Sequence, residues 1–416
     1  MNPVFLSWGI AVGATVGVIT RPFKWPEAVW AVAGALLLVV LGLLPAQQAL
    51  QAVGKGTDVY LFLFGMMVLS EVGRREGLFD WVAVLAVNHA KGSPRRLFFL
   101  VYVVGVVITT FLSNDATAVV LTPAVFAAAK KAQTKPLPLL FVCALIANAA
   151  SFVLPISNPA NLVLYGNHIP PLLTWMARFA VPSVLSVVAT FFMLRWSQRR
   201  ALEGACASEL ERVELSMSGR IALGGIGVTA LALLVVSAFD IQLGWPTAIL
   251  GALTAAIVLI QERKSPMPMI REISWSVLPL VAGLFVLVEM LEQTGVVGHL
   301  ADVLRAATQH GEIAAAAASG GIIAIGSNLV NNLPAGLIAS STLMQAHSPE
   351  RVVDALLIGV DLGPNLSITG SLATILWLNA IRREGENVSF LMFLKVGAVV
   401  MLPALVLAVG ARVLLW

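Results

Sequence analysis

The chain has 416 residues, of which 58% are hydrophobic and 12% charged, and its mean hydropathy is +0.90. This apolar share lies well above the roughly 45–50% of soluble domains, so the composition excludes a soluble globular protein and predicts an all-α polytopic membrane protein. We attribute the net charge of +4 to loop positions and expect no nucleic-acid partner. Two cysteines, Cys143 and Cys206, cannot form a disulfide framework.

In chain order, apolar blocks long enough to cross a hydrocarbon core of about 30 Å predict about ten transmembrane helices. They lie near residues 3–20, 27–45, 58–73, 137–165, 174–194, 219–238, 246–261, 275–291, 352–380 and 390–411. The first block lacks a basic leader and a second block follows it at once, so we expect it to be retained. Residues 97–130 and 313–345 each form two short apolar arms around a polar tip. Both segments are predicted to be re-entrant hairpins.

The positions of Lys and Arg test this threading, because these residues concentrate in cytoplasmic loops. With both termini outside, the extracytoplasmic side holds Lys55, Arg305, Arg351 and Arg412, and two more residues, Arg178 and Lys395, fall just inside span ends. The remaining 20 of the 26 basic residues lie on the cytoplasmic side. The asymmetry supports a multi-pass protein of a bacterial-type cytoplasmic (inner) membrane with both termini extracytoplasmic.

Two halves of the sequence are similar. Residues 63–77 align with 282–295 at an offset of 218, and residues 156–166 align with 368–378 at an offset of 212. The first offset pairs Gly65 with Gly283, Glu71 with Glu289, Gly77 with Gly295, Ser113 with Asn331 and Asn114 with Asn332. We therefore predict a first repeat over 1–196, a cytoplasmic linker over 197–218 and a second repeat over 219–416. Each repeat has five crossings and one hairpin, so the repeats are inverted, as in secondary transporters.

The sequence interrupts its apolar segments at four places. Two are the hairpin tips, 113–115 and 331–334, and two are the breaks 148–162 and 361–374 in the crossings that follow. Pro155, Pro159 and Pro364 remove helical hydrogen bonds in these breaks. Irregular backbone in a membrane must be buried in protein or line a cavity, and broken helices direct their polar ends at a shared point. We expect the four places to converge near the midplane.

Asp115 and Asp361 are the two deep carboxylates. An ionised Asp at this depth costs about 2.5–3.5 kcal/mol on the insertion scale, and a neutral Ser or Asn would cap a helix equally well. We therefore predict that Asp115 carries a proton. Asp361 either caps the break beside it or acts as a second proton or cation ligand. Glu71 and Glu289 are predicted to be interfacial or packing residues.

No motif indicates an enzyme, a metal or a cofactor. The chain has no GxxxxGK[ST] loop for ATP phosphates and no HExxH pair on a helix, and its five histidines show no paired metal-ligand spacing. Transport is the hypothesis that the symmetric breaks favour.

Three stretches carry a family resemblance: SNDATAVVLTPAV (113–125), GSNLVNNLPAGLIAS (326–340) and GVDLGPNLSITGSLATILWL (359–378). They resemble the arsenite efflux permeases, the ArsB-type members of the ion transporter superfamily, and the likeness extends over nearly the whole chain. The third stretch is the most specific. The first two are shared with related sodium and dicarboxylate carriers.

The resemblance implies secondary active export of arsenite, As(OH)3, and antimonite in exchange for protons by alternating access. It also implies that a separate soluble arsenite-stimulated ATPase subunit can act as a partner. As(OH)3 is uncharged near neutral pH, so amides, hydroxyls and helix ends suit it, and the lack of a cysteine cluster lets it be released. The candidate substrate-binding residues are Ser113, Asn114, Asn148, Ser151, Asn158, Asn161, Asn331, Asn332, Asn365, Thr369 and Ser371, with Asp115 and Asp361 for proton coupling.

Two alternatives share this fold. A sodium/proton antiporter could use Asp115 and Asp361 as its cation site. A sodium-coupled anion or dicarboxylate transporter should avoid an anionic Asp115 and usually has Ser-Asn-Thr at both hairpin tips, which this chain lacks. In the favoured reading, the hairpins and broken crossings move against a frame made of crossings 1–3 and 6–8.

Overall fold

The computed structural model describes residues 3–166, 169–211, 213–239 and 241–415, and every regular element within them is helical. Seven helices in this part of the chain are long and apolar enough to span a membrane: α1 (Pro3–Thr20), α6 (Pro94–Phe111), α11 (Leu172–Ser197), α12 (Met217–Ala238), α13 (Gly244–Glu262), α17 (Glu312–Val330) and α21 (Phe390–Leu415). Two bent pairs raise the number to as many as nine. They are α3 (Ala46–Lys55) with α4 (Thr57–Arg75), bent by 50°, and α15 (Val277–Gln293) with α16 (Val296–His310), bent by 72°.

The other helices are shorter. They are α2 (Glu27–Val40), α5 (Leu78–Ala90), α7 (Asn114–Ala116), α8 (Thr122–Lys131), α9 (Leu137–Ala149), α10 (Pro159–Tyr165), α14 (Met267–Glu272), α18 (Asn332–Ala346), α19 (Glu350–Leu362) and α20 (Leu372–Arg383). Single turns are η1 (Pro22–Lys24), η2 (Thr117–Leu121), η3 (Pro155–Ser157) and η4 (Gly363–Leu366). The two crossings predicted to be interrupted are broken, as α9–η3–α10 and as α19–η4–α20.

Helices α1–α4 and α12–α15 form one body, which we call the frame. Within it α4 packs against α13, α13 against α12, α15 against α2 and α2 against α1. Gly65 explains the closest of these contacts, because a Cβ atom there would overlap the backbone carbonyl of Thr247. Small residues let membrane helices approach to backbone contact in this way.

Helices α6–α11 and α17–α21 form the second body, the hairpin bundle. Helix α11 packs against α21 and α9, and α17 packs against α19. A Cβ atom on Gly320 would lie 2.7 Å from the carbonyl oxygen of Ala355, so glycine sets the spacing of α17 and α19. The first arms of the predicted hairpins, α6 and α17, have 18 and 19 residues and are longer than the short arms expected. Their re-entrance stays a prediction.

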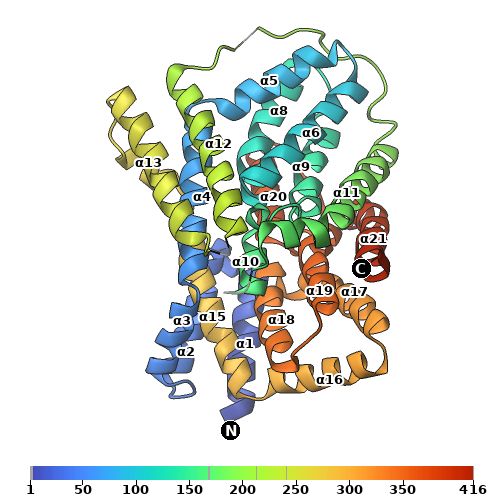
Figure 1. Cartoon of the computed structure of the whole chain (residues 1–416). Helices are drawn as coiled ribbons and strands as arrows, with labels where there is room; N and C mark the ends of the chain where they lie inside the picture. Colours follow the sequence, from blue (N-terminus) through green and yellow to red (C-terminus); the bar gives the residue numbers. More distant parts are fainter. Residues whose placement is uncertain (1–2, 167–168, 212, 240, 416) are drawn as a thin grey trace.

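Two helices, α5 and α16, cross opposite ends of the molecule (Figure 1). Each follows a glycine with left-handed backbone, Gly77 (φ 70°) before α5 and Gly295 (φ 82°) before α16. These glycines are paired at the offset of 218, so equivalent sequence positions make equivalent turns. Helices α6 and α8 lie near the α5 end, and α17, α18 and the N-terminus lie near the α16 end (Figure 1). The sequence predicts that the α5 end is cytoplasmic.

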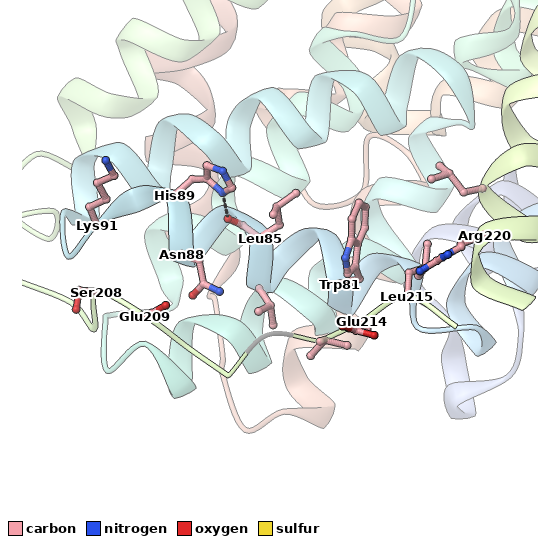
Figure 2. Close-up of a pocket in the computed structure, with 13 residues that line it drawn as sticks. Trp81, Leu85, Asn88, His89, Lys91, Ser208, Glu209, Glu214, Leu215 and Arg220 are labelled. Carbon is pink, nitrogen blue, oxygen red and sulfur yellow. Dashed lines mark hydrogen bonds between the residues drawn. The ribbon is translucent and has the colours of Figure 1, made fainter. Parts of the chain in front are cut away.

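The linker between α11 and α12 is attached to the α5 end. The Asn88 side chain donates to the carbonyl of Leu210 (3.2 Å) and accepts from its N–H (2.6 Å). Ala207 N–H donates to the carbonyl of Ala132 (2.8 Å), at the end of α8. A cavity of about 870 Å³ lies between α5, the linker and the start of α12 (Figure 2). None of the predicted site residues lines it.

Candidate functional site

The first hairpin tip is capped by Ser113. Its Oγ accepts the N–H of Ala116 (3.2 Å), and the Asn114 side chain accepts only from the neighbouring N–H of Asp115 (2.9 Å). Ser113 is therefore the cap of this tip. Asp115 is left in the first turn of the second arm, with its carboxylate free for another role.

Asp115 lines a cavity of about 530 Å³ between the frame and the hairpin bundle. The frame wall comes from α4, α14 and the start of α15, and the bundle wall comes from the hairpin tip, Pro159 of α10 and the end of α20. Ser113 lines the same cavity. Within the described residues, no hydrogen bond or ion pair reaches the Asp115 carboxylate. We call this space the first cavity.

Charged residues on the first cavity's frame wall are already paired. Arg74 donates to both oxygens of Glu71 (2.9 and 2.7 Å) and also pairs with Glu272. Glu71 is thus an internal ion-pair partner, in line with the packing role predicted for it. Arg383 at the end of α20 lines the opposite wall and makes no ion pair among the described residues.

The break between α9 and α10 is held by amide side chains. Asn161 Nδ2 donates to the carbonyls of Ser151 (2.9 Å), Leu154 (3.3 Å) and Pro155 (3.2 Å) in the irregular backbone of the break. Ser151 Oγ donates to the carbonyl of Ala147 (2.7 Å). Both side chains serve the local backbone and lie outside the first cavity.

Asp361 lies near the end of α19, where it is completely buried. Its Oδ1 accepts from Asn158 Nδ2 (2.8 Å), and its Oδ2 has no hydrogen-bond partner in the described part of the chain. Asp361 is therefore not the N-terminal cap that one reading allowed. Asn158 itself caps α10 through the N–H of Ala160 (3.0 Å). The Asn158–Asp361 bond ties the two broken crossings together.

A second network joins the same crossings. Asn148 Nδ2 donates to Asn365 Oδ1 (3.0 Å) and to Thr374 Oγ1 (3.3 Å), and Asn365 Nδ2 donates to the carbonyl of Leu145 (2.8 Å). Ser371 caps α20 through the N–H of Thr374 (3.1 Å). All of these side chains are buried.

The second hairpin tip bonds to the break that follows it. Asn331 has left-handed backbone (φ 74°), and its side chain donates to the carbonyl of Thr369 (3.4 Å). The N–H of Asn332 donates to the carbonyl of Gly370 (2.8 Å), and Thr369 Oγ1 donates to the carbonyl of Asn328 (3.0 Å). This tip is therefore fixed to the bundle at several points.

Three members of these networks were not among the predicted site residues: Asn328, Ser367 and Thr374. Asn328 Nδ2 donates to the carbonyls of Ala324 (2.7 Å) and Gly363 (3.0 Å), and Ser367 Oγ donates to Asn328 Oδ1 (2.8 Å). The family resemblance could have identified them, because all three lie within the stretches that carry it.

The predicted site residues therefore fall into two groups. Ser113 and Asp115 line the first cavity. The others lie outside that cavity, in the bonds that hold the tips and breaks together: Asn114, Asn148, Ser151, Asn158, Asn161, Asn331, Asn332, Asp361, Asn365, Thr369 and Ser371. The carboxylates of Asp115 and Asp361 thus have different surroundings.

Comparison with known proteins identifies the family. The profile of the CitMHS family, described as citrate transporter, matches residues 15–359. The chain is 26% identical over 364 residues to the arsenical pump membrane protein of Escherichia coli, which covers 84% of both chains. It is 27% identical over 376 residues to an uncharacterized transporter of Mycobacterium tuberculosis, which covers 86% of both.

A solved structure shares the fold. The YdaH transporter of Alcanivorax borkumensis, whose crystal structure has an unusual topology, is 15% identical and superposes with a TM-score of 0.57. The match covers 99% of this chain and 98% of that one. This protein is a multi-pass membrane transporter, and it belongs to the CitMHS citrate transporter family of the ion transporter superfamily.

Proposed function

We propose that this protein exports arsenite, As(OH)3, and antimonite across a bacterial-type cytoplasmic membrane in exchange for protons, with both termini extracytoplasmic. The observation that carries the proposal is the Asp115 carboxylate, which lines a 530 Å³ cavity between two helical bodies with no partner among the described residues. The similarity to arsenical pump membrane proteins supports arsenite as the cargo.

The chemistry of Asp115 suits exchange. An ionised carboxylate offers two oxygens that accept hydrogen bonds from the hydroxyl groups of As(OH)3. A protonated Asp115 loses part of this acceptor capacity, so proton and cargo compete for one side chain. Ser113 Oγ, in the same cavity, supplies a further polar contact. Competition between cargo and proton at one residue is the basis of antiport.

Alternating access would move the hairpin bundle against the frame. The networks of Asn148, Asn158 and Asn331 lie within the bundle, so the tips and broken crossings can move together. The first cavity contacts the ends of α4 and α20 near the α5 end, so cargo would enter there from the cytoplasm. Release requires the bundle to present the tip of α7 toward the α16 end.

Citrate is the second candidate, because the matching family is described as citrate transporter. Arg383 favours it, since this guanidinium lines the first cavity without an ion pair among the described residues. Asp115 opposes it, because a polyanion would meet an unpaired carboxylate in the same space. The balance of charge therefore favours a neutral cargo.

The test is proton movement in proteoliposomes that hold a pH gradient. As(III), Sb(III), citrate and sodium are added separately to wild type, to Asp115→Asn and to Glu203→Gln, a control at an exposed carboxylate of the linker. We expect As(III) and Sb(III) to dissipate the gradient in wild type and in the control but not in Asp115→Asn. Dissipation by citrate or sodium alone would assign the transporter to one of the alternative classes.

The same assay tests whether transport by this chain requires a partner ATPase. Export coupled to protons proceeds in vesicles without ATP. If As(III) moves only when a soluble arsenite-stimulated ATPase and ATP are supplied, the chain acts as the membrane subunit of a pump, and proton exchange is rejected.

A further inference from the structure

A second cavity, of about 470 Å³, lies toward the α16 end. Its walls come from the junction of α3 and α4, from α10, from α15 and from α18. Its lining includes Lys55, Asp58, Tyr165, Glu289, Glu292 and Ser341. None of the predicted site residues does.

The second cavity is the repeat counterpart of the first. At the offset of 218 residues, lining residues of one cavity pair with lining residues of the other: Met67 with Phe285, Ser70 with Val288, Glu71 with Glu289, Arg74 with Glu292, Val119 with Leu337 and Pro123 with Ser341. Equivalent helices therefore build both spaces, at opposite ends of the molecule. If the first is an opening of the transport pathway, the second is its opposite opening.

The charge is opposite at one pair of equivalent positions: Arg74 lines the first cavity, and Glu292 lines the second. Apart from Asp115, the charged residues of the first cavity balance, as two carboxylates and two guanidinium groups. The second cavity has three carboxylates, on Asp58, Glu289 and Glu292, and one ammonium group. Lys55 Nζ lies 2.6 Å from Glu289 and 3.9 Å from Glu292, so a single cation serves both.

Arg305, a charged group close to the second cavity, already has partners. Helix α18 contributes no titratable residue to its wall, and Gln345 at the rim accepts from Arg305 of α16 through its carbonyl (2.9 Å). Arg305 also pairs with Asp302 (2.7 Å). Asp58 Oδ1 accepts from the N–H of Gly244 at the start of α13 (2.7 Å), and among the described residues no ion pair reaches Asp58, so the second cavity keeps an excess of negative charge.

Hydrogen bonds lead inward from this cavity toward Asp361. Tyr165 lines the cavity and donates to the fully buried Asp354 (2.5 Å), and Asn158 donates to Asp361 (2.8 Å). Both donors belong to α10 and its cap and both acceptors to α19. Each pair is seven residues apart, about 10 Å along a helix. We call these two separate bonds between α10 and α19 the seam, with Tyr165–Asp354 at its outer end and Asp361, whose Oδ2 has no hydrogen-bond partner among the described residues, at its inner end.

Asp354 itself is fixed by arginines. Arg412 donates to its Oδ2 from Nε (2.7 Å) and lies 2.6 Å away through Nη2, and Arg178 lies 3.8 Å from its Oδ1. Arg178 also pairs with Glu350 (2.6 Å). This arrangement holds α10, α11, α19 and α21 together, so the seam is rigid.

We infer that the second cavity is the opening through which the coupling proton enters, and that its walls attract monovalent cations, hydronium included, over anions. The identity of the coupling ion rests on the proposed function, whereas the preference for cations follows from the cavity alone. A neutral cargo such as As(OH)3 is not held back by such walls, so its exit and the entry of protons can share one opening.

The experiment measures the local potential with charged thiol reagents. In a Cys143→Ala, Cys206→Ser background, Ser341→Cys reports on the second cavity and Ser274→Cys on the first, since both serines line their cavities. Each variant in proteoliposomes reacts with a cationic and an anionic methanethiosulfonate at low salt. The ratio of the cationic to the anionic rate is expected to be higher at position 341.

The charge-reversing variant Glu292→Arg gives the decisive comparison. A unit charge at about 10 Å in water changes a local ion concentration roughly twofold, so two charges change it roughly fourfold for each reagent and change the ratio of two opposite reagents roughly sixteenfold. Glu292→Gln should give an intermediate ratio. The inference is overturned if the ratio at position 341 does not respond to Glu292→Arg, or if it is no higher than at position 274.

A transport readout keeps this inference separate from the proposed function. If As(III) moves protons in wild type, Glu292→Arg should raise the external proton concentration for half-maximal exchange about fourfold, from the same Coulomb arithmetic. An unchanged midpoint overturns the proton entry at this cavity. If wild type shows no As(III)-driven proton movement, the proposed function fails, and the thiol-reagent ratio still decides whether the cavity prefers cations.

Discussion

The hydrogen bond between Asn158 and Asp361 gives the most direct test of how the broken crossings are held. Asn158 has two functions, since its oxygen caps α10 and its nitrogen donates to Asp361. Asn158→Ser keeps an oxygen close to the N–H of Ala160 but is too short to reach Asp361. The variant therefore separates the cap from the contact between the two repeats.

The loss of stability caused by Asn158→Ser depends on which hydrogen-bond partners Asp361 keeps. Since Asp361 Oδ2 has no partner among the described residues, Asn158→Ser leaves the whole carboxylate without one. Loss of a hydrogen bond to a buried polar group costs about 1–3 kcal/mol, and coupling energies between membrane helices average about 0.6 and reach about 1.7 kcal/mol. We expect Asn158→Ser to cost about 2 kcal/mol and its coupling to Asp361→Asn to be about 1 kcal/mol.

The assay is equilibrium unfolding in mixed detergent micelles for wild type, both single variants and the double variant, all at one pH. A coupling energy below about 0.3 kcal/mol would show that the two side chains contribute independently. The hydrogen bond between Asn158 and Asp361 would then form as a result of the fold without stabilising it. It would no longer support the proposal that the two broken crossings move as one body.

Three further predictions concern other parts of the fold. Gly65→Val should destabilise the frame by about 1–3 kcal/mol, because its Cβ would overlap the Thr247 carbonyl, whereas Gly9→Val on α1, with no atom within 4 Å, should leave the unfolding midpoint unchanged. Asn88→Ala should speed proteolysis of the linker over residues 198–216, because both hydrogen bonds to Leu210 are lost; an unchanged cleavage rate would contradict this attachment. Burial, with a hydrogen bond that the protonated Glu76 donates to Glu262, raises the pKa of Glu76 at the end of α4 above its usual 4.5. Stability from this group is present below pH 4.5 and is lost as pH rises through the raised pKa, so Glu76→Gln should stabilise the protein at pH 7 and not at pH 4, as thermal unfolding can show.

The sequence was sufficient to predict the helical class and the positions of the breaks, because both depend on local chemistry. Long apolar runs indicate spans. Pro364 lies two residues after the end of α19, and Pro155 and Pro159 begin η3 and α10 after the end of α9, so prolines mark both breaks. Gly77 and Gly295, which the sequence pairs, both have left-handed backbone. The inverted orientation of the repeats remains a prediction.

The surroundings of the carboxylates could not be predicted, since they depend on partners far away in the chain. Asp115 and Asp361 are both acidic residues within apolar segments, yet Asp361 meets Asn158, 203 residues earlier, and Asp115 meets an open cavity. Asp354 was not singled out, because it follows Glu350 and Arg351 in a polar stretch. Its burial depends on Arg412, 58 residues later.

The contact between frame and bundle is different in kind from the contacts within each. In the described part of the chain, α2–α4, α12, α13 and α15 share no hydrogen bond or ion pair with α6–α11 or α17–α21. Where the bodies meet, as α10 and η2 meet α4 and α18 meets α15, buried apolar side chains make the contact. Apolar contacts are non-directional, so sliding exchanges one such contact for another without breaking a polar bond. Directional bonds, by contrast, hold the tips and breaks of the bundle in register. A transporter that moves its site as a unit needs this combination, and the seam from Tyr165 to Asp361 would move with it.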